Sequence, residues 1–145
     1  MSLALTIANA VEAELNSAPA GSFEIEFTAE TKLIPAYELS ELQTLKVTVV
    51  PKTVSIVSST RAQSQYDISV DIGIQKRVGK NVEQDSLPLL KLADDISDYL
   101  RSQPLTDAPW AKFLTVTNDP IYDPGLLVEK RTFTGVLTLT YRAIK

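Results

Sequence analysis

The sequence predicts an α+β fold, a mixed and mostly antiparallel sheet with two helices packed on one face. Residues 65–75 alternate strictly between polar and apolar side chains, and residues 133–142 largely repeat that pattern, which is typical of strands with one buried and one wet face. Residues 3–16 and 86–102 repeat apolar side chains at helical spacing instead. Strands grouped between helices, rather than alternating singly with them, favour the α+β class.

The length of 145 residues corresponds to one domain, residues 1–145, large enough to bury a core. The net charge of -4 and the pI near 4.8 argue against a protein that coats nucleic acid, because such proteins usually carry a basic face. Charges or prolines interrupt every apolar run well before the roughly 18 residues that a membrane span needs. We therefore expect no membrane contact, and we interpret the apolar N-terminus as a helix rather than a signal peptide.

The first helix is expected from Leu3 to about Asn16, with Ser2 as its N-cap. Pro19 and Gly21 follow, as is usual where a helix ends. The polar segment 29–40 predicts a loop or an irregular sheet edge. Between them, a first strand is expected where apolar side chains alternate with polar ones, at Phe23, Ile25 and Phe27.

A second strand is predicted around residues 44–49, and Pro51 is expected to end it because proline has no N–H for a ladder. Residues 54–59 continue as a short extended piece, and a polar connection leads to the long strand at 65–75. Arg77 to Asn81 is predicted to be a loop.

The second helix is expected to begin at Asp85 or Ser86, with Pro88 in its first turn, where a missing N–H is harmless. Residues 103–109 end it, and a strand follows at 110–117. Residues 118–125 form a turn-rich connection, and a last strand is expected from Leu127 to Arg142. The long strands carry Thr and Ser on their polar face, which indicates a face that is wet or covered by a partner.

Catalytic chemistry has few carriers in this chain, because it lacks histidine, cysteine and a glycine-rich phosphate loop. The carboxylates remain. Asp94, Asp95 and Asp98 could bind a divalent cation, but the solvated face of an amphipathic helix is the favoured interpretation. Asn118, Asp119 and Asp123 could hold calcium, but an Asx-capped turn is favoured. We therefore expect no enzyme activity, no cofactor and no metal.

Five residues are candidates for contacts with other proteins. Trp110, the only tryptophan, either anchors an interface or closes the open end of the sheet. Arg61, Arg77 and Lys80 lie in or beside loops, where they either meet an acidic neighbour or phosphate or are ordinary solvated charges. Tyr122, in the turn-rich connection, is the fifth candidate.

The order and texture of these elements resemble the tail terminator (tail completion) proteins of long-tailed bacteriophages and prophages. The resemblance rests on the N-terminal helix, the strand LKVTVVP at 45–51, the strand YDISVDIGI at 66–74, the Leu-rich helix and the strand FTGVLTLTY at 133–141. It covers almost the whole chain, and the length agrees. It implies an α+β domain that forms a ring, usually a hexamer, on the head-proximal end of the tail tube.

For this chain the resemblance implies a virion structural protein, assembled in the host cytoplasm, that stops tube polymerisation and joins the tail to the head connector. Its partners would be further copies of itself, the tail tube protein and the head–tail connector protein, while DNA passes without specific binding. An acidic lumen would repel DNA, and the candidates for it are Glu24, Glu26, Asp67 and Asp71. Three alternatives stay open: another connector, stopper or tube component, a small binding or adaptor module, and, least favoured, a carboxylate enzyme.

Overall fold

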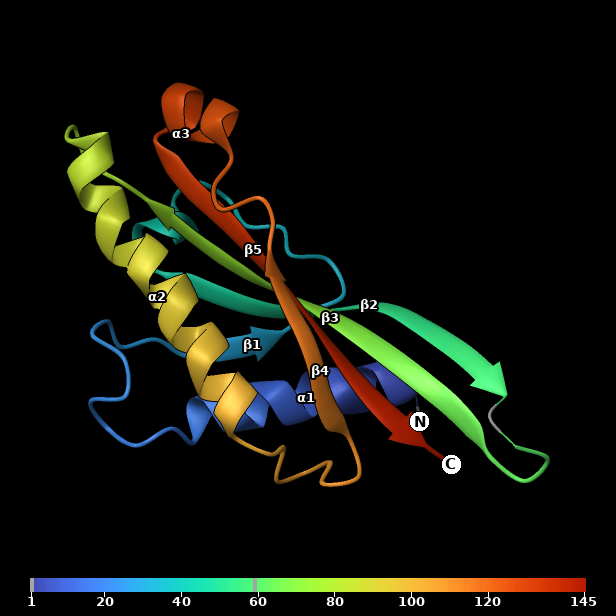
Figure 1. Cartoon of the computed structure of the whole chain (residues 1–145). Coiled ribbons are helices and arrows are strands. Elements are labelled where there is room, and N and C mark those ends of the chain that lie inside the picture. The colour runs from blue at the N-terminus through green and yellow to red at the C-terminus, as the bar shows by residue number, and fades with distance from the viewer. Residues whose placement is uncertain (1, 59) are drawn as a thin grey trace.

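A computed structural model describes residues 2–58 and 60–145, and it has the predicted α+β architecture (Figure 1). Five strands form one sheet in the order β1-β2-β3-β5-β4; β1 runs parallel to β2, and all other pairs are antiparallel. In chain order the elements are α1 (Leu3–Asn16), β1 (Ala29–Thr31), the short 3-10 helix η1 (Glu41–Gln43), β2 (Lys46–Ser58), β3 (Ser64–Arg77), α2 (Val82–Ser102), β4 (Lys112–Asn118), α3 (Pro124–Lys130) and β5 (Thr132–Ile144).

The core lies between one face of the sheet and the helices α1 and α2 (Figure 1). The apolar positions of the long strand, Ile68, Val70, Ile72 and Ile74, have no exposed surface. Fully burying one such side chain stabilises a fold by about 1.5–3 kcal/mol. The alternation in residues 65–75 therefore predicted the buried face of β3 correctly, and β5 buries its own predicted face in the same way.

Helix α1 begins and ends where the sequence predicts. The Ser2 hydroxyl accepts a hydrogen bond from the Leu5 N–H at 3.4 Å. At the other end, the Asn16 side chain accepts from the Ala29 N–H at 2.8 Å and donates to the Ala29 carbonyl at 3.0 Å. Asn16 thus takes the place of a neighbouring strand and closes the outer edge of β1 at that residue.

Glu14 joins α1 to the segment that follows α2. Only 8 % of this residue is exposed, and its carboxylate accepts from the Thr106 N–H at 2.9 Å and from the Thr106 hydroxyl at 2.6 Å. Because a buried charge destabilises a fold unless it is hydrogen-bonded, these two bonds explain how a glutamate can sit on the buried side of the helix.

The strand expected at Phe23, Ile25 and Phe27 is wrong. These side chains do alternate with exposed neighbours and pack against the core, but residues 23–28 form no ladder, and β1 contains only Ala29–Thr31. The Phe23 ring lies 5.2 Å from Phe27 and 5.5 Å from Tyr99 of α2. Aromatic packing against the helix produces the same alternation of burial as a strand does.

The sequence predicted that Pro51 would end the second strand. This is wrong, because β2 continues through Pro51. The Val49 carbonyl accepts from the Lys32 N–H at 3.0 Å, on the side of β2 that faces β1. Main-chain groups alternate in direction along a strand, so the missing N–H of Pro51 points to that same side, beyond the end of β1 at Thr31. Pro51 therefore removes no hydrogen bond to β3, which is where proline is tolerated in a sheet.

A bulge follows immediately, because the register with β3 shifts between Pro51 and Thr53 and leaves Lys52 as an extra residue. The extended piece expected at 54–59 belongs to β2 as far as Ser58, and residue 59 lies outside the described residues. Beyond the bulge, β2 stays paired with β3 as far as Ser58, and β5 stays paired with the other side of β3 as far as Ile144.

Helix α2 begins earlier than predicted, at Val82, and Pro88 lies inside it rather than in its first turn. Pro88 and Gln84 are both exposed, so water can satisfy the Gln84 carbonyl that Pro88 leaves without an N–H partner. Asp85, expected to be a cap, instead accepts from the Gly79 N–H at 2.8 Å and holds the preceding loop against the helix.

The last strand does not begin at Leu127, because α3 (Pro124–Lys130) occupies the first part of that segment. Asp123 is its N-cap and accepts from the Leu126 N–H at 3.1 Å, while Pro124 sits at the first helical position. Arg131 ends α3 with a φ of 49°, and β5 starts at the next residue. In addition to the two predicted helices, the structure therefore contains α3, which the sequence did not predict. The strand expected at 110–117 is present as β4.

Candidate assembly surfaces

On the polar face of the sheet, several side chains form hydrogen bonds or ion pairs with side chains of neighbouring strands. The hydroxyls of Ser69 on β3 and Thr140 on β5 share a hydrogen bond of 2.8 Å. One row along, Asp71 accepts from the Thr138 hydroxyl at 2.6 Å and forms a salt bridge of 3.5 Å with Lys52. Because these groups are already paired, the face can remain in water without a partner.

A bidentate ion pair lies on the same face, on the other side of the Ser69–Thr140 pair from Asp71. Arg142 donates to the two carboxylate oxygens of Asp67 at 2.8 and 3.1 Å. Hydrogen bonding from the guanidinium, helped by its charge and opposed by partial burial, lowers the pKa of Asp67, and the same contact raises the pKa of Arg142. Asp67 is therefore ionised, but Arg142 compensates its charge.

The four acidic residues expected to line a lumen do not form one group. Asp67 and Asp71 lie four residues apart on the polar face of β3, with Ser69 between them. Glu24 and Glu26 belong to the segment before β1, where Glu24 forms a salt bridge of 3.1 Å with Lys91 of α2 and Glu26 is exposed. Whether any of the four faces a channel stays a prediction.

The interface candidates divide between the two ends of the sheet. Arg61 lies in the turn between β2 and β3, and Trp110 precedes β4 at the same end, with the Lys145 ammonium 5.2 Å from its ring. Arg77 and Lys80 lie at the opposite end, where β3 finishes, and Tyr122 lies in the connection from β4 to α3. These five residues are therefore divided between two ends of the sheet and do not form one site.

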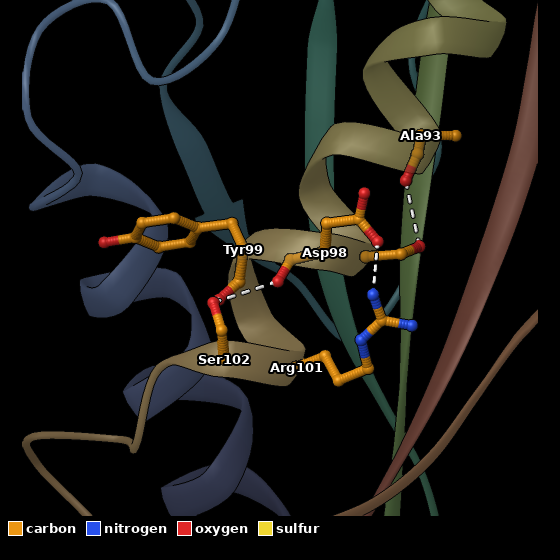
Figure 2. Close-up of polar contacts among 6 residues, drawn as sticks. Ala93, Asp98, Tyr99, Arg101 and Ser102 are labelled. Atoms are coloured by element: carbon orange, nitrogen blue, oxygen red, sulfur yellow. Dashed lines mark hydrogen bonds and ion pairs between the residues drawn. The ribbon is translucent and has the colours of Figure 1, made fainter.

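Two carboxylates of α2 pair with basic residues of the same helix. Asp98 forms a salt bridge of 2.8 Å with Arg101, and Asp95 one of 3.0 Å with Lys91; Figure 2 shows the first, beside the hydroxyl of Ser102 bonded to carbonyls of the preceding turn. Asp94 is exposed. Among the described residues, no group of three or more acidic side chains could hold a metal ion.

The other acidic cluster is a helix entry. Asp123 caps α3, in agreement with the Asx-capped turn favoured from the sequence. Asp119 and Pro120 extend the pairing of β4 with β5, because the Asp119 N–H donates to the Val136 carbonyl and the Val136 N–H donates to the Pro120 carbonyl, both at 3.0 Å. This segment has a structural role in holding the loop against β5.

Sequence reasoning missed the clearest unpartnered surface, the outer edge of β2. β1 pairs with β2 only from Val47 to Val49. We call the rest, residues 50–58, the open β2 edge; it carries side chains that are apolar and 39–61 % exposed, namely Val54, Ile56 and Val57. An edge strand of this kind is a template for pairing with another chain. The signal in the sequence that could have revealed this edge is the alternation of polar and apolar side chains that continues beyond Pro51.

A second edge is open on the opposite side of the sheet. β4 pairs with β5 alone. We call its outer side, residues 112–118, the β4 edge. It too bears an exposed apolar side chain, Leu114 at 39 %, at the point where the register with β5 shifts. The sheet therefore presents two different unpaired edges.

A cavity of about 910 Å³ lies where the segment before β1 separates from the start of β2. Residues 25–30 and 43–47 line it, together with Glu12 and Lys76. Charges of both signs and two stretches of main chain line it, a combination that identifies no particular ligand.

The helices of the described residues are all too short or too polar to cross a membrane. No model of a known protein family matches this chain, and no curated protein does.

Proposed function

We propose that this chain is a non-catalytic structural protein that joins copies of itself head to tail into a ring. The observation that carries the proposal is the pair of open sheet edges, which differ from each other and lie on opposite sides of the molecule. Contacts between two different surfaces are heterologous, and such contacts generate a closed ring when the rotation between copies closes.

The role of such a ring, we propose, is that of a phage tail terminator, capping the head-proximal end of the tail tube. The resemblance of the strands at 45–51, 66–74 and 133–141 to that family supports this role. The polar face of the sheet supports it as well, because its paired hydroxyls and carboxylates suit a wet surface. A net charge of -4 on each copy would keep passing DNA from binding.

Contacts along the tail axis need surfaces apart from the two edges. Helix α3 offers one, since Val128 is 79 % exposed and Leu126 is 38 % exposed on a short helix at the start of β5 (Figure 1). Exposed apolar side chains grouped in this way mark interaction sites. We assign this end to the tube protein or the head connector.

The proposal is tested by mixing the purified chain with assembling tail tube protein from the same genome and imaging the tubes by negative-stain electron microscopy. We expect short tubes whose ends carry an added ring, with lengths that fall as the chain is added in excess. A matched reaction with bovine serum albumin controls for crowding. Tubes of unchanged length and bare ends would overturn the proposed role.

A further inference from the structure

We propose that the β4 edge of one copy pairs with the open β2 edge of the next, so that one sheet continues from copy to copy. This inference rests on the proposed ring and specifies its junction. The occupant of each edge is therefore a second copy of this chain. Height, strand direction, main-chain orientation and side-chain chemistry support the pairing independently.

The two edges lie at the same height in the sheet. Thr53 on β2 is opposite Ser69, Ser69 is opposite Thr140, and Thr140 is opposite Thr115 on β4. The neighbouring row runs through Val54, Ile68, Tyr141 and Phe113. β4 therefore spans the part of the sheet in which β2 has lost β1 as a partner. In a ring whose axis runs along the strands, the rotation that relates one copy to the next does not shift the copies along that axis. The β4 edge of one copy therefore meets the open β2 edge of the next at the same level.

Strand direction agrees with this junction. β2, β3, β5 and β4 alternate in direction, because each neighbouring pair is antiparallel. Rotation about the same axis leaves the direction of every strand unchanged. The β4 of one copy and the β2 of the next would then be antiparallel, which is the pairing that needs no crossover and is the commoner type.

The main-chain groups of the two edges point outward at matching positions. Ser64 and Lys145 exchange both main-chain hydrogen bonds, at 2.7 and 3.0 Å, which sets the alternation along β3 and β5. It follows from the register that Val54 directs its N–H and C=O away from β3, and Phe113 directs its own away from β5. Val54 and Phe113 stand in the same row, so they would form a hydrogen-bonded pair across the junction.

Side-chain chemistry is continuous across the same junction. Val54 and Phe113 are on the helix-covered side of the sheet, whereas Thr53 and Thr115 are on the polar side, in the row that contains the Ser69–Thr140 hydrogen bond. Pairing would bury the apolar side chains together and extend the row of hydroxyls. The contrast with β1 is informative, because Asn16 closes that edge within the chain and nothing among the described residues closes residues 50–58.

The absence of cysteine from the chain makes a disulfide test direct. Ser55→Cys and Lys112→Cys, which lie directly opposite each other when Val54 pairs with Phe113, are combined in one chain and oxidised with diamide. Non-reducing gel electrophoresis reads the products. Directly opposite residues in an antiparallel pair have Cα atoms about 4.5–5.5 Å apart, within disulfide range. Within one copy, three strand spacings of about 4.8 Å separate the two positions, which is too far for a disulfide. Any cross-link therefore joins two copies.

We expect the double variant to give a ladder of covalent oligomers that dithiothreitol removes, while each single variant stays monomeric. Ser55→Cys with Ser102→Cys, which moves the second thiol to the end of α2, is the matched control and should give no ladder. If the melting temperature shows that this first pair does not fold, Thr53→Cys with Thr115→Cys repeats the test; these positions share a row of the sheet and are offset by the extra residue Leu114.

The same samples, reduced, are imaged for rings so that the two proposals can fail separately. Rings without cross-links in either double variant overturn the junction and leave the proposed ring standing. Covalent dimers of Ser55→Cys alone also overturn it, because they show that two β2 edges pair with each other. If neither rings nor cross-links form at any protein concentration, with or without assembling tail tube protein, both proposals are overturned.

Discussion

At the residue scale, Gly135 is the position where the fold leaves least room for a side chain. A Cβ there would lie 2.5 Å from the Ile121 carbonyl oxygen, in the loop that packs across β5, and 3.3 Å from the Phe133 ring. Gly73 on β3 has ample room, since the atom nearest to its Cβ position is 4.0 Å away. The two glycines occupy neighbouring central strands but are present for different reasons.

Gly135→Ala should therefore lower the free energy of unfolding by about 1–3 kcal/mol, because the loop main chain must shift. Gly73→Ala is the matched control, and it should leave stability unchanged or raise it slightly. Urea unfolding of the two variants measures both. Equal transition midpoints would contradict the packing of residues 119–123 on β5.

The hydroxyl of Tyr141 is buried and has no hydrogen-bond partner among the described residues, and burial raises its pKa. Tyr141→Phe should therefore leave the melting temperature unchanged or raise it, since it removes an unsatisfied polar atom. Tyr37→Phe is the control, because the Tyr37 hydroxyl is 2.7 Å from that of Thr48, and losing this bond should reduce stability by about 1 kcal/mol. A larger loss at Tyr141 than at Tyr37 would refute this account of the core.

The ion pair of Asp67 with Arg142 makes a pH-dependent contribution to stability. Because the contact lowers the pKa of folded Asp67, its contribution is fully present above the unfolded value of about 3.9 and is lost as pH falls through the folded value. Wild type should be more stable than Asp67→Asn at pH 7, and the difference in melting temperature should shrink toward acid pH. A difference independent of pH would mean that the carboxylate charge plays no part.

At the element scale, the sequence predicted those parts of the fold that repeat one pattern over a long stretch. The alternation in 65–75 located β3 because its buried side chains are uninterrupted. The strand expected at Phe23 failed because side chains packing on a helix produce the same alternation without a ladder. Pro51 misled because its effect depends on which side of β2 has a neighbour, and α3 was missed because seven residues carry too little periodicity.

The candidate assembly surfaces were predictable only in part, for a similar reason. The residues of the polar face could be assigned from Thr and Ser alternation, but their pairing, such as Asp67 with Arg142, joins positions far apart in the chain. An open edge is a property of the sheet order. No local pattern in the sequence indicates that β1 stops opposite Val49 and leaves the outer side of Val54 without a neighbouring strand.

The loop after β3 supports a prediction about partner binding. Its main chain is held by the Gly79–Asp85 contact and by a hydrogen bond of 2.7 Å from the Val78 N–H to the Arg131 carbonyl, so the side chains of Arg77 and Lys80 can change without moving it. Arg77→Glu combined with Lys80→Glu should preserve the melting temperature and abolish capping of tail tubes, as seen by electron microscopy.

A variant with the same change in charge controls for the effect of net charge alone. Lys91→Glu combined with Arg101→Glu reverses two cations on α2, and their surface ion pairs contribute little to stability. This variant should still cap tubes. Capping by both variants, or by neither, would argue against a specific contact at the end of β3.

At the scale of the whole molecule, one sheet separates two surfaces with different properties. Helices α1 and α2 cover one face and bury the core, while the other face carries cross-strand polar pairs (Figure 1). The edges between the faces are unequal, with β1 closed at Ala29 and both residues 50–58 and β4 open. This asymmetry is what a subunit needs to bind the next copy and in turn be bound by the previous one.

The central claim is that this chain closes into a ring through its own edges. Light-scattering mass after size exclusion, at low and high protein concentration and combined with negative-stain images, tests it most directly. We predict closed particles with an open centre and a mass that approaches about six times 15.9 kDa as concentration rises. A mass of one chain at every concentration, with no rings in solution or on added tube ends, would contradict the account.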